Sequence, residues 1–510
     1  MNWADLAEAV FMAVYTFALV MVSLYGFHRY MIVFLYYKNR RKVPKTPRTF
    51  DELPRVTVQL PMYNERHVAR RIIEGACRID YPRDRLQIQV LDDSTDGTDE
   101  IALATVEQCR RRGFDIEYIR RDHRRGYKAG ALENGLKTAT GEFITIFDAD
   151  FIPSPDILRK SIHYFTDPAI CVVQTRWEHL NRDDSMLTRA QAIFLDGHFA
   201  IEHVARNRSQ RFMSFNGTAG TWRRAAIEDA GGWQHDTLTE DLDLSYRAQL
   251  KGWKFVFLPE LTAPAELPPE MMAFKAQQFR WTKGGAQTAL KLLPKILLSK
   301  APWKVKIEAF FHLTCFTMHL YVLLLVVLMY PAMHLKTVPL EYGTIWRGAF
   351  DLGVFTLATL SASVFYIASQ VELLRDWRTV VKYMPVLMAV GVGLSVSNAK
   401  AVLEALFGKH SEFVRTPKYG SSKPVSSPGA ARKARPRKRR SLVPYIELLF
   451  GLYMTACLLH STINLHATIA APFLAMFTFG FFYVGVMTLV ARRAREANES
   501  PAPVAGRGGS

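Results

Sequence analysis

Five stretches of this sequence are long and apolar enough to span a bilayer, and they limit the possible folds more than any other feature. They cover residues 9–37, 305–333, 347–371, 442–463 and 469–490. A helix that crosses the hydrocarbon needs about 20 apolar residues. Hydrophobic residues make up 49% of the chain, but residues 38–300 read as a soluble domain. The sequence therefore predicts a polytopic membrane protein with one large domain on one side.

The positions of the basic residues explain the net charge. The chain has 510 residues, which predicts at least two domains, and a formal net charge of +18. Basic clusters lie beside the apolar stretches at Lys38–Lys42, Arg432–Arg440 and Arg492–Arg495. Cytoplasmic loops of membrane proteins carry such an excess, which attracts anionic lipid headgroups. The pattern favours the lipid bilayer as a partner and argues against nucleic acid.

The cysteines and the N-terminus suggest a cytosolic setting and an anchor. The five cysteines have no paired spacing, which argues against a zinc site or a disulfide framework and fits a reducing cytosol. The N-terminus has no basic n-region and no cleavage site of small residues. We therefore expect the first apolar stretch to be an anchor rather than a removed signal.

The basic clusters also predict the topology. Lys38–Lys42 places the end of the first span in the cytosol, and the large domain with it. Residues 382–407 are apolar enough to suggest a sixth span, but a crossing there would put both later basic clusters outside. We therefore interpret this segment as an interfacial helix. The prediction is a protein of the inner or plasma membrane with five spans and its C-terminus inside.

These patterns divide the chain into consecutive parts. The predicted parts are a first transmembrane helix (1–37), a cytosolic domain (38–267), amphipathic interface helices (268–303), transmembrane helices 2 and 3 (304–372), an interface helix with a basic cytosolic loop (373–440), transmembrane helices 4 and 5 (441–491) and a disordered tail (492–510).

Strand and helix patterns alternate in the soluble part, which predicts an α/β fold with a largely parallel sheet. Helical patterns separate the four predicted strands, and ligands of such sheets bind at the carboxyl ends of the strands. The predicted strands cover residues 55–61, 86–91, 116–119 and 143–147.

Two carboxylates follow the last of these strands. Asp148 and Asp150 come directly after the apolar run Phe143–Phe147. Side chains at i and i+2 leave a strand on the same face, so both could reach one hard cation. That cation could hold a diphosphate and neutralise it as it leaves. A surface turn is the alternative, but the fully apolar strand favours a ligand site.

Other polar motifs each have a functional and a structural interpretation. The segment Asp92-Asp93-Ser94 could contact a ligand or simply cap a helix. Lys128 lies beside two glycines at a helix start, where it could contact phosphate or be solvated. The pair Glu240-Asp241 could supply a base or merely begin a helix, where carboxylates are favoured. The order and spacing of the whole set favour the functional interpretation.

A further motif supplies an arginine and a tryptophan, which offer a phosphate clamp and a flat ring. It is Gln277-Gln278-Phe279-Arg280-Trp281. Trp281 could instead anchor an interfacial helix. Together with the carboxylates, this element predicts a glycosyltransferase that uses a nucleotide sugar.

These motifs resemble family-2 glycosyltransferases of the processive, membrane-embedded kind, above all the cellulose synthases and the plant cellulose-synthase-like mannan and glucan synthases. The resemblance runs from about Val56 to Lys418. A gating loop is implied by Phe413, Thr416 and Lys418, although Arg415 stands where the pattern has valine. The domain that binds cyclic dinucleotides in bacterial cellulose synthases is not evident. The most specific stretches are Gln174–Trp177, Phe215–Gly220, Gly231–Trp233, Thr239–Asp241 and Gln277–Trp281.

The resemblance implies a GT-A domain inserted into a helical membrane domain, and a role for each residue of the site. Asp241, beside Glu240, would be the general base, and Asp148 and Asp150 would hold Mg²⁺ or Mn²⁺. The donor would be held by Tyr63, Glu65, Asp92, Asp93, Lys128, Asp148, Gln277 and Arg280, and the acceptor by Trp281, Gly217 and Thr218.

The implied function is an inverting synthase that polymerises hexose into a β-linked polysaccharide and moves the growing chain across the membrane. UDP-glucose is favoured as the donor, with GDP-mannose as the alternative, and accessory secretion proteins are candidate partners. Two other interpretations stay open. One is a non-processive enzyme that glycosylates a lipid, and the other is a catalytically inactive membrane scaffold, against which the intact carboxylates argue.

Overall fold

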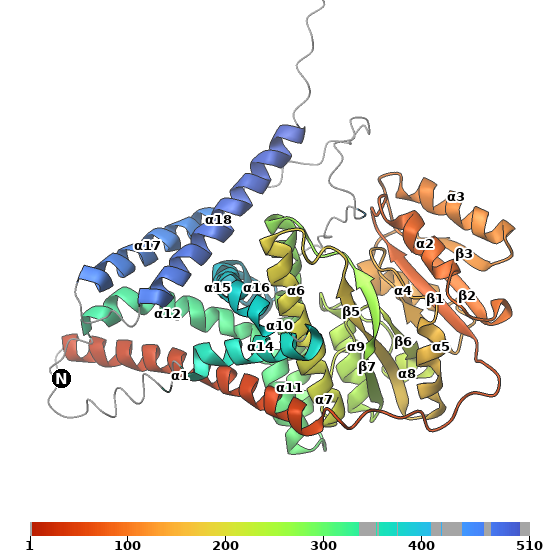
Figure 1. Cartoon of the computed structure of the whole chain (residues 1–510), viewed down its shortest axis with the longest axis horizontal. Helices are drawn as coiled ribbons and strands as arrows, with labels where there is room; N and C mark the ends of the chain where they lie inside the picture. The colour runs from red at the N-terminus through yellow and green to blue at the C-terminus, as the bar shows by residue number, and fades with distance from the viewer. Residues whose placement is uncertain are drawn as a thin grey trace, which may run out of the picture.

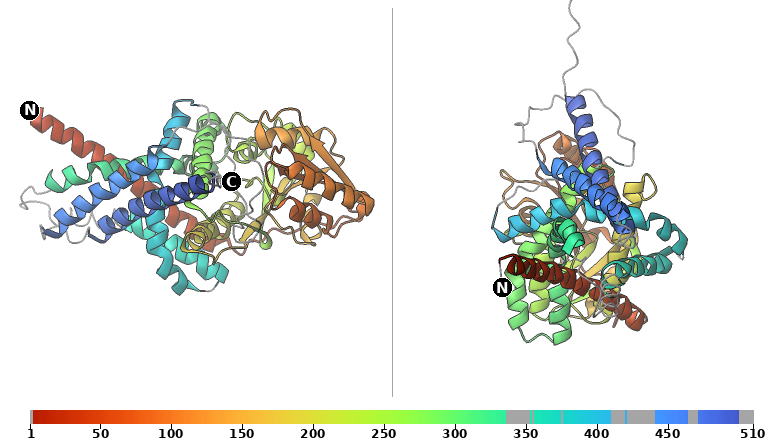
Figure 2. Two further views of the ribbon diagram at one scale, coloured as in Figure 1. Left: turned by 90° about the horizontal axis from the view of Figure 1, so that it is seen from above. Right: turned by 90° about the vertical axis from the view of Figure 1, so that its left-hand side faces the viewer.

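The computed structural model places a sheet at one end of the molecule and long apolar helices at the other (Figures 1 and 2). It describes residues 3–335, 353, 356–374, 376–409, 420, 441–463 and 471–499. Strand and helix alternate through the first half of the sheet, as the sequence predicts.

The sheet has seven strands in the order β3-β2-β1-β4-β6-β5-β7. Four neighbouring strands, β3, β2, β1 and β4, are parallel. β6 runs antiparallel to both β4 and β5, and β5 is parallel to β7. The predicted mostly parallel α/β sheet is therefore confirmed. The strands are β1 (Val56–Met62), β2 (Leu86–Asp92), β3 (Asp115–Arg120), β4 (Phe143–Ile146), β5 (Ile170–His179), β6 (Gly220–Arg223) and β7 (Lys254–Ala265).

The central strands are apolar on both faces because helices cover both. Phe143 of β4 packs in one hydrophobic cluster with Ile72 of the helix α2. Its neighbour Ile144 packs in a second cluster with Leu132 of the helix α4. Side chains alternate between the two faces of a strand, so a strand buried on both sides reads as a continuous apolar run.

The helices of the sheet domain are mostly short. A π-helical turn at Gly197–His203 joins α6 to α7. The α-helices are α2 (Ala69–Cys77), α3 (Thr98–Arg111), α4 (Tyr127–Leu136), α5 (Ile157–Ser161), α6 (Met186–Asp196), α7 (Val204–Arg208), α8 (Arg224–Asp229) and α9 (Glu240–Leu250).

Longer helices follow the sheet, and α1 (Trp3–Asn39) precedes it. Between α12 and α14 a short π-helix covers Thr356–Leu360. The remaining helices are α10 (Met271–Leu298), α11 (Trp303–Thr314), α12 (Met318–Leu335), α14 (Ser361–Leu374), α15 (Trp377–Gly393), α16 (Ser395–Leu406), α17 (Val443–Ile463) and α18 (Ala471–Glu499).

Five helical segments among the described residues are long and apolar enough to cross a membrane, and each overlaps a predicted span. A polytopic membrane protein is therefore confirmed. α15 and α16 form a pair bent by 40°, which would be a sixth span if the pair crossed as one. The interfacial placement of residues 382–407 and the side of the membrane that carries the sheet stay predictions. The five segments are Trp3–Asn39, Trp303–Met333, Thr356–Leu374, Val443–Ile463 and Ala471–Ala494.

The helix α10 joins the sheet domain to the apolar helices. It contacts α9 on one side and α11, α16 and α18 on the other. Its Lys275 forms a buried ion pair with Glu447 of α17 at 2.6 Å and donates to Thr488 of α18 at 3.3 Å. Residues of α10 that face the sheet are thereby fixed relative to the last two spans.

Candidate active site

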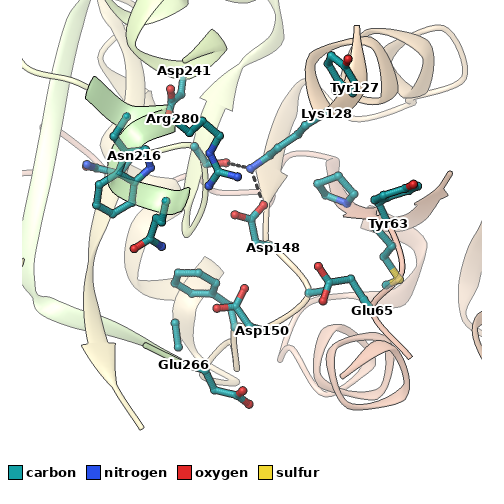
Figure 3. A pocket seen from close by; sticks show the side chains of 18 of the residues that line it. Tyr63, Glu65, Tyr127, Lys128, Asp148, Asp150, Asn216, Asp241, Glu266 and Arg280 are labelled. Atoms are coloured by element: carbon teal, nitrogen blue, oxygen red, sulfur yellow. Dashed lines mark hydrogen bonds and ion pairs between the residues drawn. The ribbon is translucent and has the colours of Figure 1, made fainter. Parts of the chain in front are cut away.

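A cavity of about 1240 Å³, counted with the open space at its mouth, lies at the carboxyl ends of β1 and β4. The start of α9 and one face of α10 close its other side (Figure 3). Twelve of the predicted site residues line it. They are Tyr63, Glu65, Asp93, Lys128, Asp148, Asp150, Gly217, Glu240, Asp241, Gln277, Arg280 and Trp281.

Lys128 and Asp148 meet near the centre of the cavity (Figure 3). The Lys128 ammonium forms an ion pair with Asp148 and donates to the carbonyl oxygen of Gly217 at 2.9 Å. Burial alone would lower the pKa of Lys128, but Asp148, Glu240 and Asp241 more than offset it, so the pKa is raised. Lys128 therefore stays charged, at the start of α4 as the sequence predicts, and can bind a phosphate.

Asp148 and Asp150 both line the cavity, although β4 ends at Ile146. The sequence argument from strand alternation is therefore wrong in detail, because the two carboxylates lie in the turn after the strand. The Asp148 N–H donates to Thr218 Oγ1 at 2.8 Å, and Arg71 donates to the carbonyl oxygen of Asp150 at 3.1 Å. These bonds fix the turn and present both residues to the cavity.

The two carboxylates form a donor set that suits a hard cation shared with a diphosphate. Among the described residues no group of three or more His, Cys, Asp or Glu could hold a metal ion alone. Carboxylate oxygens suit Mg²⁺ and Mn²⁺, and Mg²⁺ is usually bound by one or two carboxylates together with substrate phosphates. The residues present therefore fit a cation that arrives with its nucleotide.

Asp241 lies in the first turn of α9 and faces the cavity (Figure 3). Burial and the neighbouring Glu240 carboxylate raise its pKa to about 7, while Lys128 opposes the shift. A carboxylate with a pKa near neutrality is suited to general base catalysis. Burial likewise raises the pKa of Glu240. The adjacent carboxylates thus lie in a site where protonation is favoured.

A glycine makes room for this arrangement. Gly217 has φ +80, and a Cβ there would lie 2.8 Å from Asp241 Oδ2 and 3.5 Å from Lys128 Nζ. A positive φ is unfavourable for residues with a side chain. Any other residue at 217 would therefore be strained and would intrude between Asp241 and Lys128. The glycine leaves this space open.

Arg280 and Trp281 reach the cavity from α10. Burial lowers the pKa of Arg280, while Glu240 and Asp148 oppose the shift. A Cβ on Gly284 would lie 2.6–2.8 Å from atoms of Thr239, the residue before α9. The backbone of α10 therefore packs directly against Thr239, with no room for a side chain at position 284. This close packing sets Arg280 and Trp281 against the start of the helix that carries Asp241.

Two predicted residues do not reach the cavity. Asp92 is 1% exposed, and its carboxylate accepts from the Ser94 N–H at 2.9 Å and the Tyr118 hydroxyl at 3.0 Å. Thr218 is fully buried and accepts from Asp148. Asp92 ends β2 and precedes Asp93, which lines the cavity, and adjacent side chains point to opposite sides of an extended chain. Thr218 follows Gly217 in a bend, where its hydroxyl holds the backbone of Asp148. Both therefore support the site from behind.

The remaining predicted residues, Phe413, Thr416 and Lys418, lie outside the described residues. The structure also places residues in the cavity that the sequence argument did not assign to it. Three of them, Tyr127, Trp177 and Asn216, belong to or adjoin motifs already noted in the sequence, and that proximity was the available signal. Of the other three, Arg124 precedes α4, His179 ends β5 and Glu266 follows β7.

The chain matches a family model and curated relatives. The model "Glycosyltransferase like family 2" matches residues 54–284. The chain is 37% identical over 429 residues to Glucomannan 4-beta-mannosyltransferase 2 of Arabidopsis thaliana, covering 80% of this chain and 76% of that protein. It is 35% identical over 450 residues to Glucomannan 4-beta-mannosyltransferase 7 of the same plant, covering 85% of this chain and 77% of that protein. Both matches extend well beyond the family model.

A solved structure has the same fold. Mannosyltransferase PcManGT from Pyrobaculum calidifontis, in complex with GDP-Man and Mn²⁺, aligns with a TM-score of 0.50 at 22% identity. The alignment covers 71% of this chain and 99% of that one. The expected GT-A-type arrangement of the sheet is thereby confirmed.

Proposed function

This chain belongs to glycosyltransferase family 2, among its cellulose-synthase-like members, and from that premise we propose that it builds a β-linked mannan or glucomannan from GDP-mannose at a membrane. It is a hexosyltransferase embedded in a membrane. The observation that carries the proposal is the 37% identity over 429 residues to a glucomannan 4-β-mannosyltransferase. That length exceeds the sheet domain, so the resemblance includes part of the helices that follow it.

The proposed donor differs from the one that the sequence favoured. The preference for UDP-glucose finds no support among the relatives, whose names give mannosyl transfer. The structural neighbour was solved with GDP-Man and Mn²⁺. We therefore take GDP-mannose as the donor, with Mg²⁺ or Mn²⁺ as its cation and a growing glucomannan as the acceptor.

The chemistry follows from the positions of the cavity residues. Asp241 accepts the proton of the acceptor hydroxyl, and that oxygen forms a bond to the anomeric carbon of the donor. The bond from this carbon to the diphosphate oxygen breaks in the same step, which inverts the configuration. Lys128 and Arg280 are positioned to bind the negatively charged leaving group. Asp148 and Asp150 would hold the cation, which neutralises charge on the diphosphate.

The acceptor side of the cavity supports elongation of a sugar chain. Trp177 and Trp281 both line it, and Trp281 belongs to the helix that contacts the apolar helices α16 and α18. Aromatic rings present flat apolar surfaces against which the face of a sugar can pack. A polymer built here could pass between the spans, whereas a polar chain cannot cross hydrocarbon unaided. We propose that the sheet domain is cytosolic and that synthesis and translocation are coupled.

Product analysis tests the proposal. The full-length protein in lipid nanodiscs is incubated with Mn²⁺ and radiolabelled GDP-mannose or UDP-glucose, singly and together. The expected result is a high-molecular-weight product from GDP-mannose that an endo-β-1,4-mannanase digests. Use of UDP-glucose alone would refute the donor, and a product of one or two sugars on lipid would refute the polymer synthase.

A further inference from the structure

An arginine covers the face of a tyrosine on the strand side of the cavity. The Arg124 guanidinium carbon lies 3.3 Å from the centre of the Tyr63 ring and 4.9 Å from that of Tyr127. All three residues line the cavity, and Tyr63 directly follows β1. The planar Arg124 guanidinium thus covers the flat face of Tyr63, on which the aromatic ring of a ligand could stack instead.

The loop that carries Arg124 is fixed by a neighbouring arginine. Arg121 donates through Nε to Asp93 Oδ1 at 3.0 Å and forms an ion pair with the other carboxylate oxygen. It also donates to the carbonyl oxygens of Arg125 and Tyr127, each at 3.0 Å. Arg121, which precedes Arg124, thus binds the Asp93 carboxylate after β2 and two backbone carbonyls that follow Arg124. These contacts hold the loop against the end of β2. The position of Arg124 is built into the fold.

The side chain of Arg124 makes no such bonds with the part of the chain that the structure describes. Among the described residues its guanidinium has stacking contacts only, while the nearby Asp93 carboxylate is engaged by Arg121. Burial lowers the pKa of Arg124, and the charge of Arg121 adds to this effect, while Tyr63 and Asp93 oppose it. An arginine with unused donors in a ligand cavity is poised to give them to the ligand.

We propose that Arg124 is a specificity-determining residue that reads the guanine base of the donor. The base stacks on Tyr63, and the displaced guanidinium donates two parallel hydrogen bonds to guanine O6 and N7. Guanine presents two adjacent acceptors at this edge, and arginine matches them with its fork. Adenine has a donor at the position of O6, and uracil has no counterpart of N7. This inference rests on the proposed function, since it explains how the site would select a guanosine diphosphate sugar.

Binding of nucleoside diphosphates to the full-length protein in detergent micelles tests the proposal without turnover. Isothermal titration with Mn²⁺ compares GDP, IDP, ADP and UDP on wild type and on Arg124→Lys. Lysine keeps the positive charge within the cavity but loses the planar fork. We expect GDP and IDP, which share O6 and N7, to bind at least about tenfold more weakly to Arg124→Lys. The affinity for UDP should change less than about threefold, because the retained charge serves all diphosphates equally.

Arg125→Lys is the matched control, because Arg125 is exposed, lies outside the cavity lining and offers only its backbone to Arg121. It should bind all four nucleotides as wild type does, and both variants should keep the wild-type melting temperature. If Arg124→Lys lost GDP and UDP affinity equally, or lost neither, the role of Arg124 would be refuted and the proposed donor would stand. A wild-type protein that binds UDP more tightly than GDP would overturn the proposed donor as well.

Discussion

Two groups of ionisable residues in this molecule lie wholly or partly out of solvent but differ in how completely they are paired. One, which we call the cavity cluster, lies around Lys128, Asp148 and Asp241. The other, which we call the junction cluster, lies where the sheet domain meets α1 and α11. It consists of His28, His198, Glu202, Arg206 and Glu308.

The junction cluster is fully paired. Glu308, which is 0% exposed, contacts His28 Nε2 at 3.1 Å and accepts from Arg206 Nε at 2.9 Å. Arg206 also reaches Glu202 at 3.3 Å, and His198 contacts the same carboxylate at 2.9 Å. Burial would raise the pKa of Glu202, but Arg206 and His198 outweigh it, so the pKa is lowered.

In the cavity cluster the pKa of the carboxyl group shifts in the opposite direction, upward. Asp241 adjoins Glu240, and Lys128, which opposes the shift, also pairs with Asp148, so burial and like charge raise the pKa of Asp241 to about 7. Buried charges with full partners hold a structure together, and buried charges that outnumber their partners are ready for a ligand or a proton. The difference supports a functional role for the cavity and a structural role for the junction cluster.

The largest expected effect is removal of the divalent cation. Two carboxylates that face a diphosphate repel it unless a cation lies between them. Exhaustive chelation with EDTA should therefore reduce sugar transfer to background, and Mn²⁺ or Mg²⁺ should restore it. The melting temperature should stay unchanged, because the junction cluster needs no ion. Full activity after chelation would contradict the metal site.

Replacement of the base should have the next largest effect. Asp241→Asn removes proton acceptance but keeps size and polarity, and loss of a general base costs about 10²–10⁴ in rate. We expect that loss in the rate of sugar transfer, with the affinity for GDP within about threefold of wild type. A turnover near wild type would remove Asp241 from the mechanism. An equal loss of nucleotide affinity would make it a binding residue instead.

Breaking the junction cluster should reduce stability rather than chemistry. Glu308→Ala leaves Arg206 buried with one carboxylate fewer, and loss of one partner of a buried pair costs about 3–5 kcal/mol. The melting temperature and the folded yield should fall. As a control, Glu228→Ala removes the partner of Arg224 in an exposed helical pair and should cost under about 1 kcal/mol. Equal melting temperatures for the two variants would show that the buried ion pairs stabilise the fold no more than the exposed pair does.

The sequence predicted the cavity cluster far better than the junction cluster. Tyr63, Asp93 and Asp148 come shortly after β1, β2 and β4, and parallel strands bring their carboxyl ends to one edge, so a local pattern predicted that these residues converge. His28 lies within the first apolar stretch, residues 9–37, and the sequence around it gives no sign of a partner. Its partner Glu308 is 280 residues away. No local periodicity encodes such a pair, because its geometry depends on how α1 and α11 pack.

Within the site, errors came from side-chain direction. The pair Asp92 and Asp93 was assigned to the donor as a unit, but neighbours on a strand point to opposite faces, and only Asp93 reaches the cavity. Arg124 was missed because a loop arginine has no periodicity, and its stacking on Tyr63 depends on the anchors of Arg121. The antiparallel β6 was likewise not predicted, since its pairing joins β4 to β5 over long sequence separations.

The pH dependence of activity offers a smaller and graded test. The pKa of Asp241 is raised to about 7, so the base is protonated and inactive below that pH. The value of kcat/KM should fall about tenfold for each pH unit below about 7 and level off above it. A plateau that continues down to pH 5 would show that the carboxylate ionises normally. The paired Glu202, whose pKa is lowered, should contribute no inflection between pH 5 and 8.

Trp281 should have the smallest effect on rate and the clearest effect on product length. It lies next to Arg280, lines the cavity and packs partly against the main hydrophobic cluster, so it could stack on the acceptor or only support α10. Aromatic stacking is worth about 0.5–1.5 kcal/mol, so its loss should weaken retention of the acceptor by about 2–12-fold. Trp281→Ala should therefore release shorter chains, as measured by gel filtration, while hydrolysis of the donor to GDP persists. Trp281→Phe, which keeps a flat ring, should recover most of the length. A stable Trp281→Ala protein that makes chains of normal length would show that the indole only supports the helix, and the acceptor would then depend on Trp177 alone among the tryptophans described in the cavity.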